Sequence, residues 1–148
     1  MPDLTISAAA ARSGLPESTL RYWERIGLLR PVQREESSGH RRYSPEEVTL
    51  LETLANLRAV GLSIEDMRVY LAQHHRGDEA AAEQRALFQA HAQKLESELA
   101  ALQLRQTYLA LKVRYWDARE RRDLAAAAEI AAELGPVIRA INPREKSS

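Results

Sequence analysis

The first half of the chain is interrupted about every ten to fifteen residues by glycine or proline, which predicts short helices. A first helix fits residues 7–13, with Ser7 as its N-cap, a run of alanines, and Gly14 at the position that ends it. A second helix fits residues 17–26 and ends at Gly27. Two short helices joined by a tight, glycine-containing turn form the helix-turn-helix pattern, although an ordinary helical hairpin has the same geometry.

Residues 28–43 have no helical periodicity. Pro31 and a later Glu-Ser-Ser-Gly turn indicate a small β-hairpin, or wing. A strong helix start follows, because Ser44 can cap a helix in which Pro45 takes the first position and Glu47 the third.

Two helices are expected after the wing. Gly61 ends the first, whose apolar row consists of Leu50, Leu54, Leu57 and Val60 with Leu51 on its flank. Ser63 caps the second, which lasts until a polar break at residues 74–78 and faces inward with Ile64, Met67 and Leu71.

From about residue 79 the pattern becomes that of one long helix. Apolar residues alternate in steps of four and three over four heptads, with a polar interruption at Gln106. We call the apolar members the seam: Phe88, Leu95, Leu99, Leu102, Leu109, Val113 and Trp116, with Ala92 between the first two. Neither glycine nor proline occurs in residues 78–134, which favours a dimerisation coiled coil over a lone helix of a bundle.

A second apolar row lies beside the C-terminal half of the seam and consists of Leu104, Tyr108, Leu111 and Tyr115. We expect it to be covered by the amphipathic segment after Asp123, through Leu124, Ala127, Ile130, Ala131 and Leu134. Gly135-Pro136 is expected to end that segment and to leave a short apolar tail of Val137, Ile138 and Ile141.

The predicted fold is mainly α: a winged helix-turn-helix domain with a small β-hairpin wing, a long dimerisation coiled-coil helix and a short C-terminal helix. The expected divisions are residues 1–76 for the winged helix-turn-helix domain, 77–122 for the dimerisation helix and 123–148 for a short C-terminal packing region.

Composition excludes several classes of protein. The chain has no cysteine, which rules out disulfides, thiolate zinc sites, cysteine-ligated iron–sulfur clusters and thiol-based redox sensing. No apolar run has membrane-spanning length and no secretory leader is recognisable, so we expect a cytoplasmic protein without a membrane partner. No nucleophile with its base and no phosphate-binding glycine loop is recognisable, which argues against an enzyme.

Net charge is zero, so any argument for nucleic-acid binding must come from local charge. Residues 21–42 contain six arginines and three glutamates, a local net charge of +3 with histidine neutral. Ser18, Arg21 and Tyr22 share one helix face, where a guanidinium can bind guanine or phosphate and hydroxyls can bind phosphate. A solvated surface with helix salt bridges, such as Arg21 to Glu24, is the alternative.

Three ordered segments resemble the MerR family of transcription regulators. They are Thr5-Ile6-Ser7 with Gly14-Leu15-Pro16 and TLRYWERIGLL at residues 19–29, GHRRYS at residues 39–44, and LRAVGLSI at residues 57–64. These segments match the family's helix-turn-helix, its wing end and the junction of its third and fourth helices, and the resemblance covers about residues 4–72. It implies a homodimeric, DNA-binding regulator whose long helix forms an antiparallel coiled coil.

The resemblance also implies which side chains contact DNA. Thr19, Arg21 and Tyr22 match recognition-helix positions, and Arg41, Arg42 and Tyr43 match wing positions that contact phosphates. The full predicted DNA-binding set is Ser18, Thr19, Arg21, Tyr22, Arg25, His40, Arg41, Arg42 and Tyr43. Trp23 and Pro16 depart from the commoner tyrosine and serine of the family, and we expect Trp23 to belong to the core.

The mechanism implied by the resemblance is distortion of promoter DNA. A two-fold dimer would bind a palindromic operator between two poorly spaced promoter elements. Effector binding would then bend and untwist the double-stranded DNA until RNA polymerase engages both elements.

The effector is a separate question. The family's metal sensors use cysteines, and a site built from His74, His75, His91 and Asp78 is less favoured than exposed or packed histidines. No cofactor or metal is expected. A pocket for a small organic molecule could be lined by Tyr108, Leu111, Tyr115 and Trp116, although simple packing of the helices explains the same residues. An architectural DNA-binding protein, or a coiled-coil interaction protein, without an effector is the alternative function.

Overall fold

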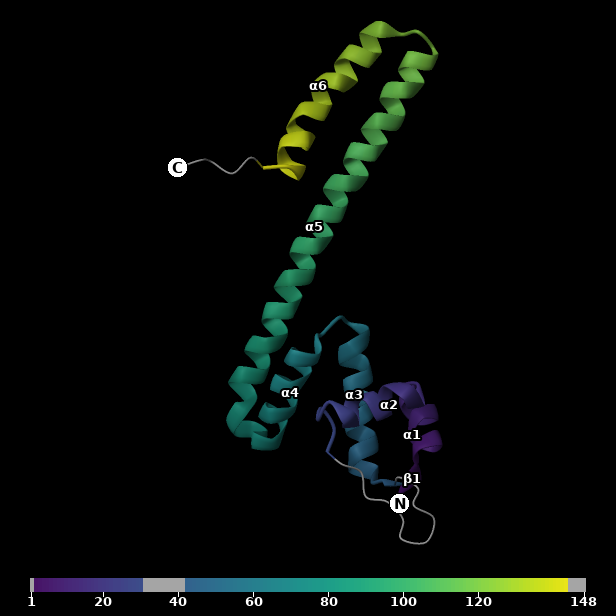
Figure 1. Cartoon of the computed structure of the whole chain (residues 1–148). Coiled ribbons are helices and arrows are strands. Elements are labelled where there is room, and N and C mark those ends of the chain that lie inside the picture. The colour runs from purple at the N-terminus through teal and green to yellow at the C-terminus, as the bar shows by residue number, and fades with distance from the viewer. Residues whose placement is uncertain (1, 31–41, 144–148) are drawn as a thin grey trace. The chain divides into compact units, whose positions relative to one another are not determined.

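In the computed structural model, the described residues are 2–30 and 42–143. The first part contains β1 (Leu4–Thr5), α1 (Ile6–Ser13), α2 (Glu17–Arg25), β2 (Arg42–Tyr43), α3 (Pro45–Ala59), α4 (Ile64–Arg76) and the 3₁₀ helix η1 (Gly77–Ala80). The long helix α5 (Ala81–Glu120) and the helix α6 (Leu124–Ile141) follow (Figure 1). The chain forms two compact units, Met1–Phe88 and Gln89–Ser148. The mainly α, winged helix-turn-helix fold is confirmed.

The predicted wing lies largely on residues 31–41, outside the described residues. Its end is described, because Arg42–Tyr43 forms β2 and pairs antiparallel with β1, with Leu4 opposite Tyr43 and Thr5 opposite Arg42. This long-range pairing also corrects the expected start of α1. Thr5 in its extended conformation caps the helix by accepting a hydrogen bond from the Ala8 amide at 3.2 Å, and Ser7 lies inside the first turn.

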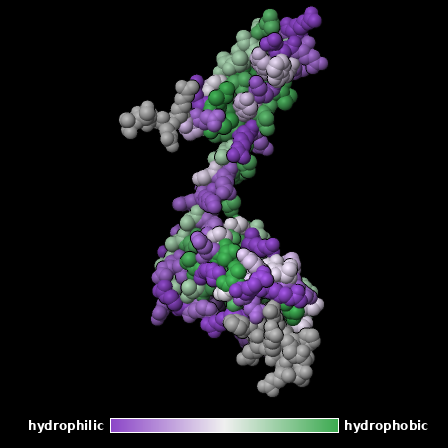
Figure 2. Space-filling view, in the orientation of Figure 1, coloured by the Kyte–Doolittle hydropathy of each residue, from purple (hydrophilic) through white to green (hydrophobic). Residues whose placement is uncertain are grey.

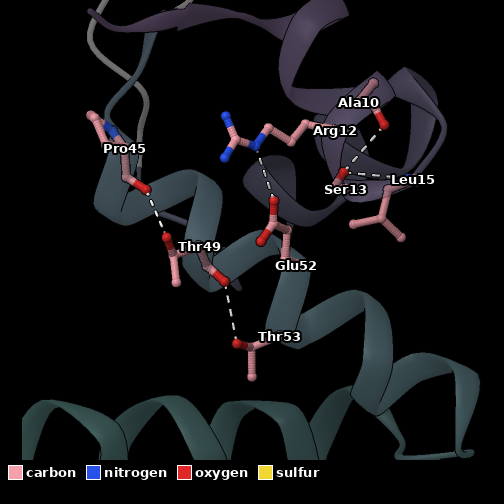
Figure 3. A network of polar contacts seen from close by, with 8 residues as sticks. All are labelled: Ala10, Arg12, Ser13, Leu15, Pro45, Thr49, Glu52 and Thr53. Atoms are coloured by element: carbon pink, nitrogen blue, oxygen red, sulfur yellow. Dashed lines mark hydrogen bonds and ion pairs between the residues drawn. The ribbon is translucent and has the colours of Figure 1, made fainter. Parts of the chain in front are cut away.

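The start of α3 has the geometry that the sequence predicts. Ser44 Oγ accepts from the Glu47 amide at 3.2 Å, and Glu47 Oε2 accepts from the Ser44 amide at 2.7 Å, so the capping box is complete. Further along the helix, Thr49 and Thr53 hydroxyls donate to carbonyls one turn back (Figure 3). Arg12 Nε lies 3.3 Å from Glu52 Oε1 and joins α1 to α3.

The first unit has one core, to which α1, α2, α3, α4 and β2 contribute. Its buried residues are Ala9, Leu15, Leu20, Trp23, Leu28, Tyr43, Val48, Leu51, Leu54, Leu57, Leu62, Met67 and Leu71. The expected apolar row of α3 was wrong at its last position, because Val60 is 56% exposed, whereas Leu50 is partly buried and packs against the core. Val60 stands at the C-cap, where the chain leaves the helix, whereas Val48 in the first turn faces the core.

An ion pair connects α4 to the start of α5 across η1. Arg76 donates from both terminal nitrogens to Glu83, with Nη2 at 3.1 Å from Oε1. This hydrogen bonding lowers the pKa of Glu83 from its ordinary value and raises that of Arg76. Both side chains are half exposed, so solvent screens the pair and its contribution to folding is small.

In the second unit, α6 folds back along the C-terminal part of α5 (Figure 1). Their shared core consists of Leu111, Ala118, Ala127, Ile130 and Leu134, with Tyr108, Tyr115, Ala126 and Val137 packed against it. The prediction that α6 covers the second apolar row is therefore confirmed for Tyr108, Leu111 and Tyr115. Leu124 and Ala131, which were expected in the contact, are exposed.

The expected end of the last helix at Gly135-Pro136 was wrong, because α6 continues to Ile141 with Pro136 inside it. Proline has no amide hydrogen and therefore removes one backbone hydrogen bond from the helix. Continuing the helix keeps Val137 packed against the core that Leu134 enters one turn earlier, which offsets this loss. In the part of the chain that the structure describes, no helix combines the length and apolar character needed to cross a bilayer.

Candidate nucleic-acid interface

The helix α2 is held in place by the two side chains on its inner face. Leu20 is fully buried and Trp23 is 2% exposed, so the expected role of Trp23 in the core is confirmed. The opposite face consequently points outward. Its exposed residues are Ser18, Arg21, Tyr22 and Arg25, and Thr19 beside them is half-buried.

The outward face of α2 is organised by two weak contacts. Arg21 Nη2 lies 3.1 Å from Glu17 Oε2, one turn earlier, and not against Glu24 as the sequence suggested. The Arg25 guanidinium lies 5.5 Å from the centre of the Tyr22 ring. Exposed pairs of this kind are worth little in water, so both guanidinium groups can exchange these contacts for phosphate or base edges.

The N-terminal end of α2 lacks a side-chain cap. Pro16 stands at the N-cap with φ −61° and ψ 146°, and its carbonyl accepts from the Thr19 amide at 3.0 Å. Proline offers no side-chain oxygen, so the Glu17 and Ser18 amides ahead of Thr19 are left for solvent or for an anion.

The C-terminal end of α2 is, in contrast, closed by several hydrogen bonds. Gly27 has φ +77°, which lets the chain turn so that the Leu28 amide donates to the Trp23 carbonyl at 2.9 Å. Arg68 of α4 adds a bond from outside, because its Nη2 donates to the Ile26 carbonyl at 2.7 Å. Sequence reasoning missed Arg68, since nothing in a local pattern connects residues that are 42 positions apart.

The predicted wing residues divide into three groups. His40 and Arg41 lie outside the described residues. Arg42 is half-buried in β2, and Tyr43 is 1% exposed and belongs to the core of the first unit. The Tyr43 ring therefore anchors the end of the wing in the core of the first unit.

Most of the seam is exposed on α5. Leu95, Leu99, Leu102, Leu109, Val113 and Trp116 are each between 50% and 71% exposed, and Figure 2 shows apolar side chains at the surface of the second unit. Phe88, at the end of the first unit, is 39% exposed and packs edge-on against Tyr70, with ring centres 6.1 Å apart.

The four residues of the predicted ligand pocket lie in different environments. Leu111 is buried between α5 and α6, Tyr115 packs edge-on to Trp116 at 5.4 Å, and Trp116 itself is exposed. Tyr108 lines a shallow cavity of about 470 Å³. The other residues around this cavity are Arg105, Leu109, Ile138, Ile141 and Asn142.

The histidines considered as metal ligands are found in other contacts. His74 stacks on Tyr70 with ring centres 5.9 Å apart, and His75 meets His74 edge-on at 6.0 Å. Among the described residues, no group of three or more histidine, aspartate or glutamate side chains is arranged to hold a metal ion.

Comparison with known proteins identifies the family. The family described as MerR HTH family regulatory protein matches residues 4–74, and the one described as MerR, DNA binding matches residues 48–111. The heavy metal-dependent transcription regulator 2 of Rhizobium meliloti (strain 1021) is 30% identical over 141 residues, which are 95% of each chain. The chain belongs to the MerR family.

Other MerR-family proteins are similar over much of their length. The HTH-type transcriptional regulator HmrR of Rhizobium leguminosarum bv. viciae is 36% identical over 105 residues, 70% of this chain and 80% of HmrR. A putative MerR regulator from Listeria monocytogenes has a TM-score of 0.62 and 28% identity, covering 88% of this chain and 98% of its own. HiNmlR, a family regulator lacking the sensor domain and bound to promoter DNA, has a TM-score of 0.58 and 27% identity, covering 80% and 94%.

As a member of the MerR family, the protein is a DNA-binding transcription regulator and not an enzyme. Family membership assigns the helix-turn-helix of α1 and α2 to DNA binding.

Proposed function

We propose that this MerR-family regulator acts as a homodimer that distorts promoter DNA in response to a small molecule or stress signal not sensed by thiols. The exposed seam of α5 is the observation that carries the proposal. The division of the chain would be residues 1–76 for DNA binding, 77–122 for dimerisation and 123–148 for packing or effector response.

A second copy of the chain is the partner that fits the seam best. At 40 residues, α5 is roughly 60 Å long. One of its apolar rows is covered by α6 within the same unit, while the seam beside it stays exposed from Leu95 to Trp116. A long row of this kind on a helix with heptad spacing is typical of a coiled-coil contact, and pairing two identical rows covers both at once.

The outward face of α2 is the proposed reading surface. Arg21, Tyr22 and Arg25 are exposed there, and the adjacent Ser18 and Thr19 hydroxyls lie near the uncapped N-terminal end of the helix. A guanidinium can bind a guanine edge through two hydrogen bonds, whereas hydroxyls and helix amides suit phosphate oxygens. Arg42, together with His40 and Arg41 before it in the sequence, would bind flanking phosphates.

The two DNA-binding domains of a dimer, bound to one palindromic site, would distort the promoter. Two-fold symmetry places the recognition helices about one helical turn of DNA apart, or a multiple of it. Smoothly bending a DNA site that spans both recognition helices costs roughly 1–6 kcal/mol, which many phosphate contacts can offset. The realigned promoter elements would then be engaged by RNA polymerase.

The absence of cysteine restricts the kind of signal that the protein can detect. Two similar regulators are named as heavy metal-dependent, but this chain offers no thiolate with which to bind a soft metal ion. The cavity beside Tyr108 supports a small organic molecule instead, since apolar side chains and a few polar groups surround it.

A regulator or architectural protein without an effector is the second candidate. It is supported by the similarity to HiNmlR, which lacks a sensor domain and of which this chain covers 94%. In that case α6 would only pack against α5.

Fluorescence energy transfer between dyes at the two ends of an operator fragment tests the proposal. We expect two protomers to bind one fragment and to change the transfer efficiency, while a fragment with a scrambled operator shows no change. Tight, operator-specific binding without any change in efficiency would contradict distortion. Specific binding by one protomer would contradict the dimer.

A further inference from the structure

We infer that Arg68 is a positioning residue that fixes the orientation of the recognition helix α2 and thereby sets operator specificity. The inference rests on the proposed role of α2 in reading DNA. It concerns a side chain on α4, which is outside the predicted DNA-binding set.

The geometry joins two elements that are far apart in sequence. Arg68 Nη2 donates to the Ile26 carbonyl at 2.7 Å. Ile26 is the C-cap of α2, and Gly27 after it has φ +77°, so the chain turns away at this point. The Ile26 carbonyl accepts from α4 at the place where the helical hydrogen-bonding pattern of α2 ends.

The charge of Arg68 suits this position. The carbonyls at a helix C-terminus carry partial negative charge, and a guanidinium there makes a charge-assisted hydrogen bond. Arg68 is exposed, but its neighbours Met67 and Leu71 are buried in the core and hold α4 in place. The donor is therefore presented from a fixed element rather than from a loop.

The helix α2 depends on contacts of this kind. It has only nine residues, and its N-cap Pro16 makes no side-chain hydrogen bond. Short helices are not stable by themselves, so tertiary contacts determine where such a helix lies. Leu20 and Trp23 fix its inner face, and Arg68 fixes its C-terminal end, which limits rotation that would displace Arg21 and Tyr22.

The planar shape of arginine matters as well. While Nη2 bonds the Ile26 carbonyl, Nη1 lies beside Gly27, at 4.0 Å from the place where a Cβ of residue 27 would be. Lysine would supply a compact charge on a flexible stem in place of a planar guanidinium, so it should restore the function only in part.

The test compares Arg68→Gln and Arg68→Lys with Arg85→Gln, a control that removes the same charge from an exposed arginine of α5 in the same unit. Affinity for operator and for random DNA is measured at several salt concentrations. We expect Arg68→Gln to lower operator affinity about tenfold, the order expected for losing one hydrogen bond to a charged group. Binding to random DNA and the salt dependence should stay unchanged. Arg68→Lys should fall between wild type and Arg68→Gln, and Arg85→Gln should behave as wild type.

A second readout reports on the bond itself. The Gly27 amide belongs to the peptide group whose carbonyl is that of Ile26, so its nitrogen resonance should shift in Arg68→Gln and not in Arg85→Gln. This measurement, with the melting temperature, separates loss of the bond from loss of the fold. Arg68→Lys carries the comparison if the glutamine variant does not fold.

Two outcomes would overturn the inference. An operator affinity unchanged in Arg68→Gln would show that the bond does not position α2. An equal loss for operator and random DNA, with a salt slope smaller by about one, would make Arg68 a phosphate contact instead. If wild-type protein itself does not distinguish operator from random DNA, the proposed function fails and not the role of Arg68.

Discussion

Neighbouring residues of α2 have opposite surroundings. Trp23 is 2% exposed and packs in the core, whereas Tyr22 before it is 45% exposed beneath the Arg25 guanidinium. This division follows from helical geometry, because successive residues point about 100° apart. Trp23 therefore holds the helix to the core, and Tyr22 contributes a hydroxyl to the outward face.

Arg21→Ala tests the outward face most directly. We expect operator binding to weaken by roughly 1–3 kcal/mol and discrimination between bases to relax, because a bidentate base contact is lost. Folding should change by about 0.5 kcal/mol or less, since the pair removed among the described residues is the exposed contact with Glu17. Fluorescence anisotropy with operator variants gives the affinities.

The matched control for Arg21→Ala is Arg114→Ala on α5. Arg114 is 58% exposed and pairs with Glu133, much as Arg21 is 55% exposed and pairs with Glu17. It should leave DNA binding unchanged. If Arg21→Ala discriminated between operator and random DNA as well as wild type does, a role in base reading would be excluded.

At the scale of elements, the sequence predicts those features that depend on neighbouring residues. The capping box at Ser44 and the positive φ of Gly14 and Gly27 each follow from a few adjacent side chains. The start of α1 at Thr5 depends on pairing with β2, which lies almost forty residues away in sequence. Likewise, Pro136 signals a helix end locally, but packing on α5 continues the helix past it.

In the candidate site, too, the features set by neighbouring residues could be predicted and those set by long-range packing could not. Helical periodicity places Ser18, Arg21 and Tyr22 on one face, and the structure leaves that face exposed. The contact between Arg68 and Ile26 could not be predicted, because it requires the relative placement of α4 and α2. Burial of Tyr43 depends equally on the packing of β2, although the motif around it was recognisable.

The two apolar rows of α5 make separate predictions possible. We expect Leu102→Arg to dissociate the homodimer, because each lost leucine contact costs about 2–5 kcal/mol and the guanidinium must also be desolvated. Leu102 is already 52% exposed in the single chain, so the variant should fold. Light scattering after size-exclusion chromatography gives the mass in solution.

The control for Leu102→Arg is Leu124→Arg. Leu124 is a leucine of α6 that is 68% exposed and lies outside the seam and outside the α5–α6 core. This variant should remain dimeric. A dimer that persists in Leu102→Arg at the same concentration would refute the seam as the dimer contact.

At the scale of the whole molecule, the question is whether the second unit reports a signal to the first. In the described part of the second unit, residues 89–120 of α5 pack with α6, and the cavity beside Tyr108 opens between these two helices. Leu109 of the seam also lines this cavity. A ligand bound there would therefore touch both α6 and the proposed dimer contact, which is a physical route from binding to dimer geometry.

Thermal denaturation with a library of small organic molecules tests this route. A compound that binds only the folded protein adds about 2.7 kcal/mol of stability at 100 times its dissociation constant, so a true effector must raise the melting temperature. Tyr108→Ala should abolish the shift, because Tyr108 lines the cavity, and Tyr22→Ala on α2 should keep it. If no compound raises the melting temperature and promoter output stays constant under stress, the proposed response to a small molecule is refuted.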